Sequence, residues 1–481
     1  NDVTQSVAVK YQGSLKAEHG TGRNMAAFIE LEWGQTAYKI MESIKNIFDT
    51  KGILNPGVII NYDKQAHLKN LKPLPATNEI VDTCIECGFC EPVCPSNEIT
   101  FTPRHRIVAN REISRLESIG EQKEADELKE AYIYDGIETC ATCGLCSTVC
   151  PVSINTGTLT KHLKAERINP LNDKVASLIA NNFSKTLLGM KFGLGSSSMA
   201  HSLLGTQNMQ GLTNSLRSIS GNMIPKWSPN LPKANTINTH FTNRSSDKKI
   251  VYFPSCINRT MGQSSESIEE KSLYDTTIEL LQKSGFEIIL PGNLNNLCCG
   301  MPFSSKGYKN QANTKSSELE NALFEVTNGG KIPVICDTSP CTKTMLSSFK
   351  NDLKIYEPIE FVLEVLTNHL NFEAIDEAIA IHSTCSTRTM GLHDKFVKLA
   401  HMCSTNVTVP KDVLCCGFAG DKGFKFPEFN KSALRNLKPA LNPDIKMAFS
   451  TSKTCEIGLS EHSGIDYNSI LYLVNRCTTA L

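Results

Sequence analysis

Two stretches of the sequence carry four cysteines each at one shared spacing, and a proline follows the last cysteine of both. The first stretch holds Cys84, Cys87, Cys90 and Cys94, and the second holds Cys140, Cys143, Cys146 and Cys150. Three thiolates separated by pairs of residues can hold one side of a small inorganic cluster from a single loop, while the fourth points into the next segment. This spacing is typical of the ligands of a cubane 4Fe–4S cluster, which carries one electron at a time.

Two such runs in one chain resemble the two-cluster bacterial ferredoxins, in which the fourth cysteine of each run binds the cluster of the other run. The resemblance therefore implies one 4Fe–4S cluster held by Cys84, Cys87, Cys90 and Cys150. It implies a second cluster held by Cys140, Cys143, Cys146 and Cys94. Zinc sites and disulfides are the alternatives, but zinc favours separated pairs of ligands and disulfides require an oxidising compartment.

Eight more cysteines form two further matching sets, each built around a Cys-Cys-Gly run. The sets are Cys256, Cys298, Cys299 and Cys341, and Cys385, Cys415, Cys416 and Cys455. Four thiolates can hold an iron–sulfur cluster, and Gly300 and Gly417 allow close backbone approach and can open a helix that faces an anionic cluster. The alternative is a pair of buried structural cysteines in each copy. Cys336, Cys403 and Cys477 match nothing across the repeat and are interpreted as ordinary buried thiols.

The Cys-Cys-Gly runs and their flanking cysteines resemble the cysteine-rich module of heterodisulfide reductases and of the iron–sulfur subunits of glycerol-3-phosphate and glycolate oxidases. The resemblance implies that these thiols hold further iron–sulfur clusters or contact the electron acceptor. The fuller family pattern closes with two cysteines, and Thr338 and Ser452 stand where the first of each pair is expected. The resemblance therefore implies at most a four-ligand site in each copy.

Residues 13–23 and the turn Asn55-Pro56-Gly57 resemble the end of the FAD-linked oxidase C-terminal domain of flavin dehydrogenases for D-2-hydroxy acids. The resemblance implies that Glu18 binds a divalent metal and that His19 is the base that takes the hydroxyl proton. It implies FAD contacts at Asn55 and Gly57, with the flavin bound mainly by a domain that this sequence lacks. The alternative is a solvated Glu-His pair on a loop.

Several elements must position these groups. Residues 33–48 have helical spacing and predict a helix that ends near Gly52. Residues 104–134, between the two cysteine runs, are charged and favour helix, which predicts a helical ferredoxin unit with a long insert. We divide the chain into an oxidase tail (1–62), a 4Fe–4S ferredoxin domain (78–165), a helical connector (166–247) and two Cys-Cys-Gly modules (248–370 and 371–481).

The two modules read as an α/β repeat. Short strands are predicted at 250–253, 287–290 and 333–336 in the first copy, and at 378–381, 407–409 and 446–449 in the second, with helices between them. Alternating strands and helices predict a parallel sheet. Because the cysteines follow the strands, we expect the four thiols of each copy to meet at the carboxyl edge of its sheet. The predicted fold class is therefore α/β and multidomain: a helical two-cluster ferredoxin unit followed by a duplicated α/β domain, and preceded by the tail of a flavin-oxidase α+β domain.

Composition limits partners and compartment. Among 481 residues, 49 Lys and Arg balance 49 Asp and Glu, so no basic field favours nucleic acid. The 19 cysteines occur in metal-like groups, which indicates a reducing compartment. No apolar run approaches the roughly eighteen residues of a membrane span, so we expect a cytoplasmic protein or one attached peripherally to the inner face of the cytoplasmic membrane. The sequence starts at Asn1 without a signal peptide, and we expect a fragment of a longer polypeptide.

The order of these parts resembles the large iron–sulfur D-lactate dehydrogenases over essentially the whole chain. The resemblance implies that electrons pass from FAD through the 4Fe–4S clusters to a quinone or a cytochrome. One alternative is oxidation of D-2-hydroxyglutarate or glycolate by the same layout. The other is a non-catalytic electron-transfer subunit of a larger complex.

Overall fold

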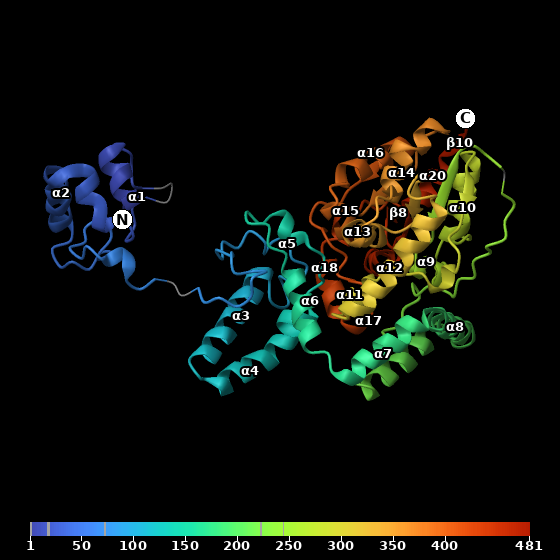
Figure 1. Ribbon diagram of the computed structural model, residues 1–481, viewed down its shortest axis with the longest axis horizontal. Coiled ribbons are helices and arrows are strands. Elements are labelled where there is room, and N and C mark those ends of the chain that lie inside the picture. The colour runs from blue at the N-terminus through green and yellow to red at the C-terminus, as the bar shows by residue number, and fades with distance from the viewer. Residues whose placement is uncertain (1, 17–19, 72–73, 222–223, 244) are drawn as a thin grey trace. The chain divides into compact units, whose positions relative to one another are not determined.

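The computed structural model describes residues 2–16, 20–71, 74–221, 224–243 and 245–481. The chain forms two compact units, Asn1–Pro75 and Ala76–Leu481 (Figure 1). Each unit is described separately below.

The first unit is built around one long helix, α2 (Ile29–Phe48). The helix begins four residues before the predicted start, and Gly34 interrupts it with a φ of 79°. Its predicted apolar residues Ile40, Ile44 and Ile47 are 56%, 53% and 71% exposed, so this unit leaves that face of the helix open. Short helices complete the unit: α1 (Asp2–Gln5), η1 (Ser6–Lys10), η2 (Ala26–Phe28) and η3 (Ala66–Leu68).

The second unit begins with the two cysteine runs, which flank a helical hairpin. The predicted helical insert is two packed helices, α3 (Pro103–Ser118) and α4 (Gln122–Tyr132). Thr102 caps α3 by accepting a hydrogen bond from the His105 amide, and Pro103 starts the helix where no amide is needed. The segment continues through η4 (Ile133–Glu138), α5 (Leu145–Thr148) and α6 (Thr156–Glu166).

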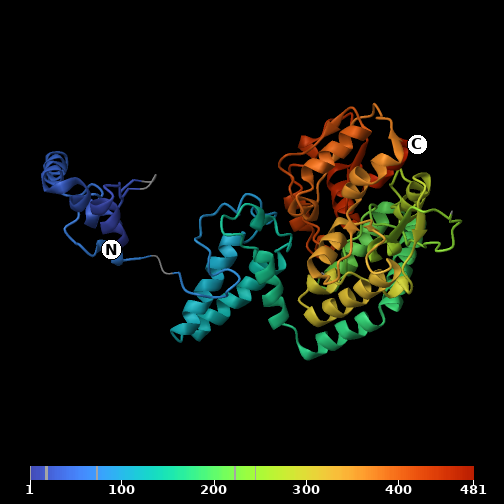
Figure 2. The ribbon, with the colours of Figure 1, turned by 45° about the horizontal axis from the view of Figure 1, so that its top comes forward.

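Two further helices connect this segment to the repeat. They are α7 (Pro170–Asn181) and α8 (Phe183–Ile219), and Figure 2 shows them along one edge of the unit. Gly205 has a φ of 73° and breaks α8 into two helical stretches. The predicted helical connector is therefore helical over most of its first two thirds and irregular after it.

Each module of the repeat contains a four-stranded parallel sheet with the same strand order. The first module has the order β2-β1-β3-β4 and the second has β7-β6-β8-β9. The strands of the first sheet are β1 (Lys249–Phe253), β2 (Glu287–Ile289), β3 (Val334–Cys336) and β4 (Ile355–Tyr356). Those of the second are β6 (Ile379–Ile381), β7 (Val407–Thr408), β8 (Met447–Ser450) and β9 (Asp466–Ser469). A small antiparallel pair joins β5 (Leu370–Phe372) to β10 (Thr478–Ala480) and so ties the end of one module to the end of the other.

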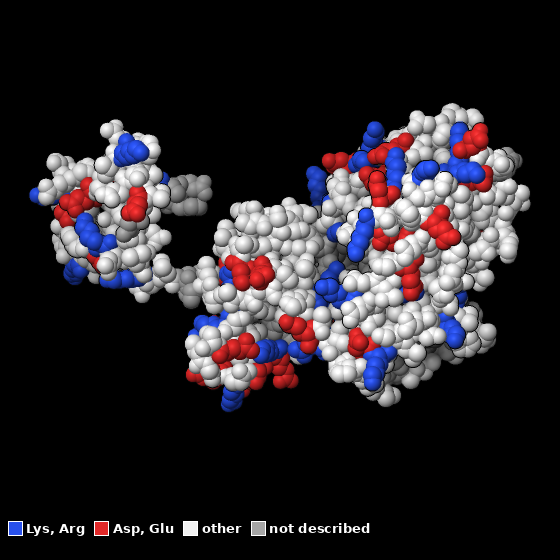
Figure 3. Space-filling model, in the orientation of Figure 1, with Lys and Arg blue, Asp and Glu red and all other residues white. Residues whose placement is uncertain are grey.

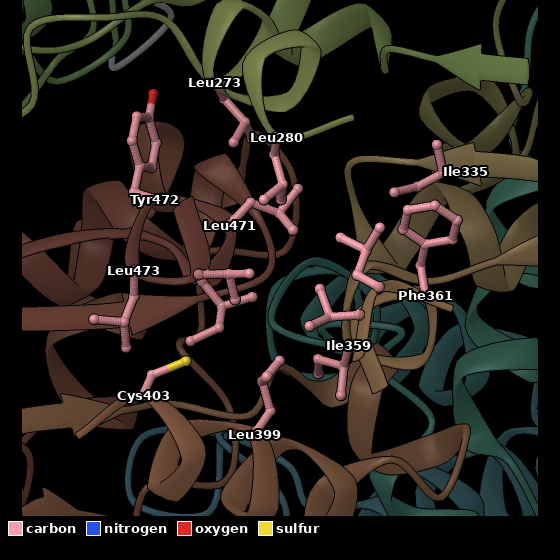
Figure 4. Packing of buried hydrophobic residues seen from close by; sticks show 14 of the residues in the cluster. Leu273, Leu280, Ile335, Ile359, Phe361, Leu399, Cys403, Leu471, Tyr472 and Leu473 are labelled. Carbon is pink, nitrogen blue, oxygen red and sulfur yellow. The ribbon is translucent and has the colours of Figure 1, made fainter. Parts of the chain in front are cut away.

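Helices on both sheets bury one core that the modules share. Figure 4 shows leucines of α10 and α20 beside Phe361 of α14 and Leu399 of α16, which come from different modules. The helices of the first module are α9 (Cys256–Thr260), α10 (Leu273–Lys283), η5 (Leu294–Asn296), α11 (Met301–Ser304), α12 (Lys309–Val326), α13 (Ser339–Ser348), α14 (Pro358–Glu364) and η6 (Leu366–Asn368). Those of the second are α15 (Cys385–Thr389), α16 (His393–Cys403), α17 (Lys422–Lys425), α18 (Pro427–Ala433), η7 (Lys438–Ala440), α19 (Lys453–Ser463) and α20 (Ile470–Arg476).

Candidate iron–sulfur centres

The eight cysteines of the two runs surround two separate hollows. The first hollow is lined by Cys84, Cys87, Cys90 and Cys150. The second is lined by Cys94, Cys140, Cys143 and Cys146. Each hollow thus combines three cysteines of one run with the fourth of the other, which is the grouping that crossed ligation requires.

Helix α3 places two arginines beneath these hollows. Arg106 is 1% exposed, and its guanidinium donates to the Cys94 sulfur at 3.6 Å and to the Ser96 hydroxyl at 2.9 Å. Arg111 pairs with Glu86 at 2.7 Å and donates to the carbonyl of Cys84. A buried cation beside thiolates offsets the negative charge of an iron–sulfur cluster, so the residues present fit such a group in both hollows.

Burial alone disfavours thiolates in these hollows. It raises the pKa of Cys90 and of Cys146 to about 11. It also raises the pKa of Cys94, where the charge of Arg106 acts in the opposite direction. Thiols held in this way need a cationic partner to lose their protons, and iron provides one.

The four predicted thiols of the first module lie in one hydrogen-bonded row at the carboxyl edge of its sheet. Cys256 contacts Cys298, Cys298 contacts Cys299, and Cys299 contacts Cys341. Cys336, at the end of β3, also contacts Cys341. Cys336 is buried, as predicted, but it lies beside the set, because it is the last residue of β3 at the same edge.

The second module repeats this row with four thiols. Cys415 contacts both Cys385 and Cys416, and the sulfur atoms of Cys416 and Cys455 are 2.8 Å apart. Ser450 occupies the position that Cys336 has in the first module, and its hydroxyl donates to the carbonyl of His382 at 3.0 Å. The second module therefore lacks the fifth thiol of the first.

One thiol in each row is the preferred site of negative charge. Hydrogen bonds from Cys298 and Cys341 lower the pKa of Cys299 to about 6. Hydrogen bonds from Cys415 and Cys455 hold the pKa of Cys416 well below its usual range. Both are the second cysteine of a Cys-Cys-Gly run, so the two copies bias the same position towards thiolate.

The glycines of these runs allow tight packing behind the thiols. Gly300 has a φ of 85°, and a Cβ atom there would lie 2.4 Å from the Ala312 carbonyl oxygen. Gly417 has a φ of 68° and would clash with Ala433. Gly300 opens the four-residue helix α11, but the expectation that Gly417 opens a helix was wrong, because α17 begins only at Lys422.

Hydroxyl groups replace the cysteines that the fuller family pattern would place at Thr338 and Ser452. The Thr338 hydroxyl bonds to the Ser255 hydroxyl and to the Asn258 amide, each at 3.0 Å. Ser452 bonds to the side chain of Cys455. These positions therefore support the backbone around the thiols instead of adding ligands.

A contact between the second hollow and the second module joins the two kinds of thiol site. Cys143 hydrogen-bonds Cys415, which lowers the pKa of Cys143 to about 7. Around this contact the ammonium of Lys343 donates to the Thr389 hydroxyl at 2.6 Å, and Lys422 donates to the carbonyls of Ile137 and Glu138. Sequence analysis gave no sign of this contact, because its partners come from segments far apart in the chain.

The predicted hydroxy-acid site lies in the first unit. Glu18 and His19 are outside the residues that the structure describes. The turn that contains Asn55 and Gly57 lies beside the end of the same motif, because Arg23 donates to the Pro56 carbonyl at 3.2 Å and the Ile59 amide donates to Gly22. The two parts of the oxidase motif are therefore neighbours.

All 19 cysteines are free thiols, so none of the pairs is a disulfide. Within the described ranges, no group of three or more His, Cys, Asp or Glu side chains is arranged around a single metal ion. No helix in this same part of the chain is long and apolar enough to cross a membrane.

Three family models match the chain in the predicted order. Residues 2–59 match the C-terminal domain of FAD linked oxidases, residues 80–154 match a 4Fe-4S dicluster domain, and residues 250–345 and 379–460 match the cysteine-rich domain. The chain therefore contains segments similar to each of these three domains. This confirms the predicted domain content and supports 4Fe–4S clusters in the dicluster domain.

Relatives of the chain carry several descriptions. An uncharacterized iron-sulfur protein of Methanocaldococcus jannaschii is 22% identical over 340 residues, which are 70% of this chain and 58% of that protein. A probable glycolate oxidase iron-sulfur subunit of Bacillus subtilis is 26% identical over 272 residues, which are 51% of this chain and 56% of that subunit. A D-2-hydroxyglutarate dehydrogenase of Pantoea ananatis is 26% identical over 274 residues, which are 40% of this chain and 26% of that enzyme. The chain spans little more than half of the first two relatives and a smaller share of the third.

Proposed function

We propose that the chain transfers single electrons from the flavin-linked oxidation of a D-2-hydroxy acid, D-lactate, towards a quinone or a cytochrome. The contact between Cys143 of the dicluster domain and Cys415 of the second module carries this proposal. It joins two thiol sites without intervening residues, and short separations favour electron transfer. The domain content and the oxidoreductases among the relatives support the same direction.

The proposed ligands follow from the hollows and the rows. Cys84, Cys87, Cys90 and Cys150 would hold one 4Fe–4S cluster, and Cys94, Cys140, Cys143 and Cys146 the other. Bound there, clusters supply one-electron chemistry, which a flavin can feed after it has accepted two electrons. Arg106 places positive charge beside the Cys94 thiol, and Arg111, whose charge Glu86 balances, holds the first loop through the Cys84 carbonyl. The rows of the modules would hold further clusters or face the acceptor.

The contact is tested by replacing Cys415 with serine in the anaerobically reconstituted chain. We expect electron transfer from the dicluster domain to slow by at least about tenfold, which corresponds to a barrier about 1.4 kcal/mol higher. Freeze-quench EPR after rapid reduction measures this step. Cys298→Ser, at the same position of the first module, is the matched control and should leave the step within about threefold of the wild type. Equal rates in both variants would show that the Cys143–Cys415 contact is not the route.

The substrate part of the proposal rests on the oxidase motif. His19 would take the hydroxyl proton of D-lactate, Glu18 would bind a divalent metal, and Asn55 and Gly57 would lie near FAD. In a polypeptide that includes a flavin domain, His19→Ala should lower kcat on the order of a hundred- to ten-thousand-fold without changing iron content. Comparing turnover of D-lactate, D-2-hydroxyglutarate and glycolate decides between the substrates, and normal turnover by His19→Ala would refute the role of this residue.

A second candidate function is that of a non-catalytic electron-transfer subunit. The relative described as a probable glycolate oxidase iron-sulfur subunit favours it, because more than half of that subunit matches this chain. The two functions differ in where the flavin is bound. Copurification of FAD and hydroxy-acid oxidation with a single polypeptide supports the dehydrogenase, whereas activity that needs a separate flavoprotein supports the subunit.

A further inference from the structure

The helical connector has a charge pattern unlike the rest of the chain. The whole chain balances 49 basic with 49 acidic residues, but the sequence contains no Asp or Glu between Asp173 and Asp247. The basic residues of this stretch are Lys174, Lys185, Lys191, Arg217, Lys226, Lys233 and Arg244. Lys226 pairs with Glu461, but the stretch itself has no acidic residue to offset the others. The connector is therefore a cationic segment in a neutral protein, which favours an anionic partner.

Helix α8 exposes a row of large apolar side chains. Leu188, Phe192, Met199 and Leu203 are 67%, 78%, 68% and 80% exposed. At a rotation of about 100° per residue, these four positions lie within about 60° of one another around the helix axis. Helix α7, which precedes α8, and the end of α8 carry further exposed apolar side chains. These are Leu171, Leu178, Leu212, Leu216 and Ile219. Figure 3 shows basic and acidic side chains among the uncharged ones in the region of α7 and α8.

The opposite side of α8 is apolar as well, but it is covered. Phe183 and Leu187 are buried in a cluster with Cys298 and Phe303, and Cys256 packs against the same cluster. One side of the helix thus packs over the thiol row of the first module, and a second apolar side faces outward. A helix that is apolar on two sides is expected to meet a non-aqueous environment on both.

We propose that α7 and α8 form a membrane-contact surface that binds anionic phospholipid. The exposed row would enter the boundary between headgroups and acyl chains, and the exposed ammonium groups of Lys174 and Lys185 would meet lipid phosphates. The helices lie along the membrane and do not cross it, because no helix among the described residues meets the requirements of a span and Gly205 breaks α8. Charge separates this partner from a second copy of the chain, since two cationic surfaces repel each other.

The proposal goes beyond the proposed electron transfer and does not depend on it. Lipid binding is measured without electron flow, so failure of one leaves the other standing. If both hold, the thiols of the first module lie directly below the lipid-facing helix, and a lipid-soluble acceptor would approach on that side.

Sedimentation with lipid vesicles tests the proposal on the whole chain. Vesicles of phosphatidylcholine and phosphatidylglycerol at three to one should bind the protein, added salt should weaken binding, and pure phosphatidylcholine should bind it much less. The triple variant Leu188→Glu, Phe192→Glu and Leu203→Glu should lower the partition coefficient between vesicles and water at least about tenfold. The reason is that three apolar side chains are no longer transferred from water into the lipid. These sites are exposed, so the fold should tolerate the changes.

A matched variant controls for the added negative charge. Ile119, Ile268 and Leu346 are 57%, 51% and 52% exposed elsewhere in the second unit, and changing all three to glutamate should alter binding by less than about threefold. Absence of binding to the anionic vesicles would overturn the proposal, as would equal losses in the two triple variants. Analytical ultracentrifugation gives the remaining outcome: a dimer that only the α8 variant dissociates would mean that a second copy, and not lipid, covers this surface.

Discussion

The chain contains two duplications, and they are built in opposite ways. In the dicluster domain each hollow is lined by three cysteines of one run and the fourth cysteine of the other run. In the modules each row of four thiols comes entirely from one copy. Exchanged ligands make two centres depend on one another, whereas self-contained rows leave each copy free to acquire different surroundings.

The modules have diverged in this way. The first module has a fifth thiol at Cys336 and lies under the apolar side of α8. The second has Ser450 at the equivalent position and touches Cys143 of the dicluster domain. The second module thus faces the proposed electron source, and the first faces the proposed membrane surface. This arrangement suits electrons that enter at one module and leave at the other.

The largest expected effect breaks the exchanged arrangement. Cys150→Ser should abolish or destabilise the cluster proposed for Cys84, Cys87 and Cys90, although the change lies in the other run. Iron and sulfide analysis should show about one cluster lost from the dicluster domain, and EPR should identify which one. In contrast, Cys298→Ser should alter only the first module. Damage by Cys150→Ser confined to the centre of Cys140, Cys143 and Cys146 would contradict the exchange.

A second comparison uses two equivalent arginines, each three residues after the first cysteine of its module. Arg259 is fully buried and donates to the carbonyls of Leu294 and Leu297, whereas Arg388 is only partly buried. Arg259→Ala should therefore destabilise the chain by on the order of 4 kcal/mol, because the buried Leu297 carbonyl loses its donor, the Leu294 carbonyl keeps only the Leu297 amide, and a cavity opens. Arg388→Ala should cost about 1 kcal/mol. Urea denaturation measures both, and similar costs would show that the two environments are energetically alike.

Local patterns explain why much of this could be predicted from the sequence. Fixed cysteine spacings specified the groups that line the hollows. A β-branched run located β3 and an apolar run located β8, each to within one residue. The strands β4 and β9 were missed, because Ile355–Tyr356 is too short for a pattern and Asp466–Ser469 has polar residues that only pairing with β8 makes extended. Propensity favours a strand at Ile355–Tyr356 but gave no signal at Asp466–Ser469.

Tertiary contacts account for the remaining differences in the candidate site. Cys336 was set aside because Ser450 replaces it in the other copy, yet its place at the end of a strand, two residues before Thr338, was a usable signal. The Cys143–Cys415 contact joins different domains, so no local spacing could indicate it. In α2, helical periodicity located the helix correctly, but it could not indicate that the apolar face of this helix is exposed in the first unit.

The third prediction concerns the junction between the modules. Glu357 of the first module is buried and accepts a hydrogen bond from Ser339, whose hydroxyl in turn accepts one from Thr387 of the second module. Burial raises the pKa of Glu357 from 4.5 to about 7. Because the folded-state pKa is the higher one, the stabilisation from the protonated carboxyl is fully present below about pH 4.5 and is lost as the pH rises through 7.

Glu357→Gln should remove this pH dependence. Between pH 4.5 and 8 the wild type should lose on the order of 3 kcal/mol of stability relative to the variant. Urea denaturation of the metal-free chain at a series of pH values measures the difference, and Glu364→Gln, at an exposed position, should follow the wild type. Parallel pH profiles for Glu357→Gln and the wild type would show that this carboxyl ionises freely in the folded chain.

The smallest expected effect comes from exchanging one residue between the copies. Phe253 and His382 occupy equivalent positions before the first cysteine of each module, and they are 0% and 2% exposed. Both ring nitrogens of His382 lack a hydrogen-bond partner, and burial lowers its pKa to about 4, so the ring is neutral near pH 7. Because an unpartnered buried polar atom costs stability, His382→Phe should stabilise the metal-free chain by about 1 kcal/mol.

The reciprocal change, Phe253→His, should destabilise the chain by about 2 kcal/mol, since it buries an imidazole whose ring position lies 5.9 Å from the Arg259 guanidinium. Denaturation of the metal-free protein at pH 7 measures both changes against the same wild type. A stabilising Phe253→His would mean that the environments of the two copies are interchangeable at this position. A destabilising His382→Phe in the metal-free chain would contradict the expectation that the unpartnered imidazole costs stability.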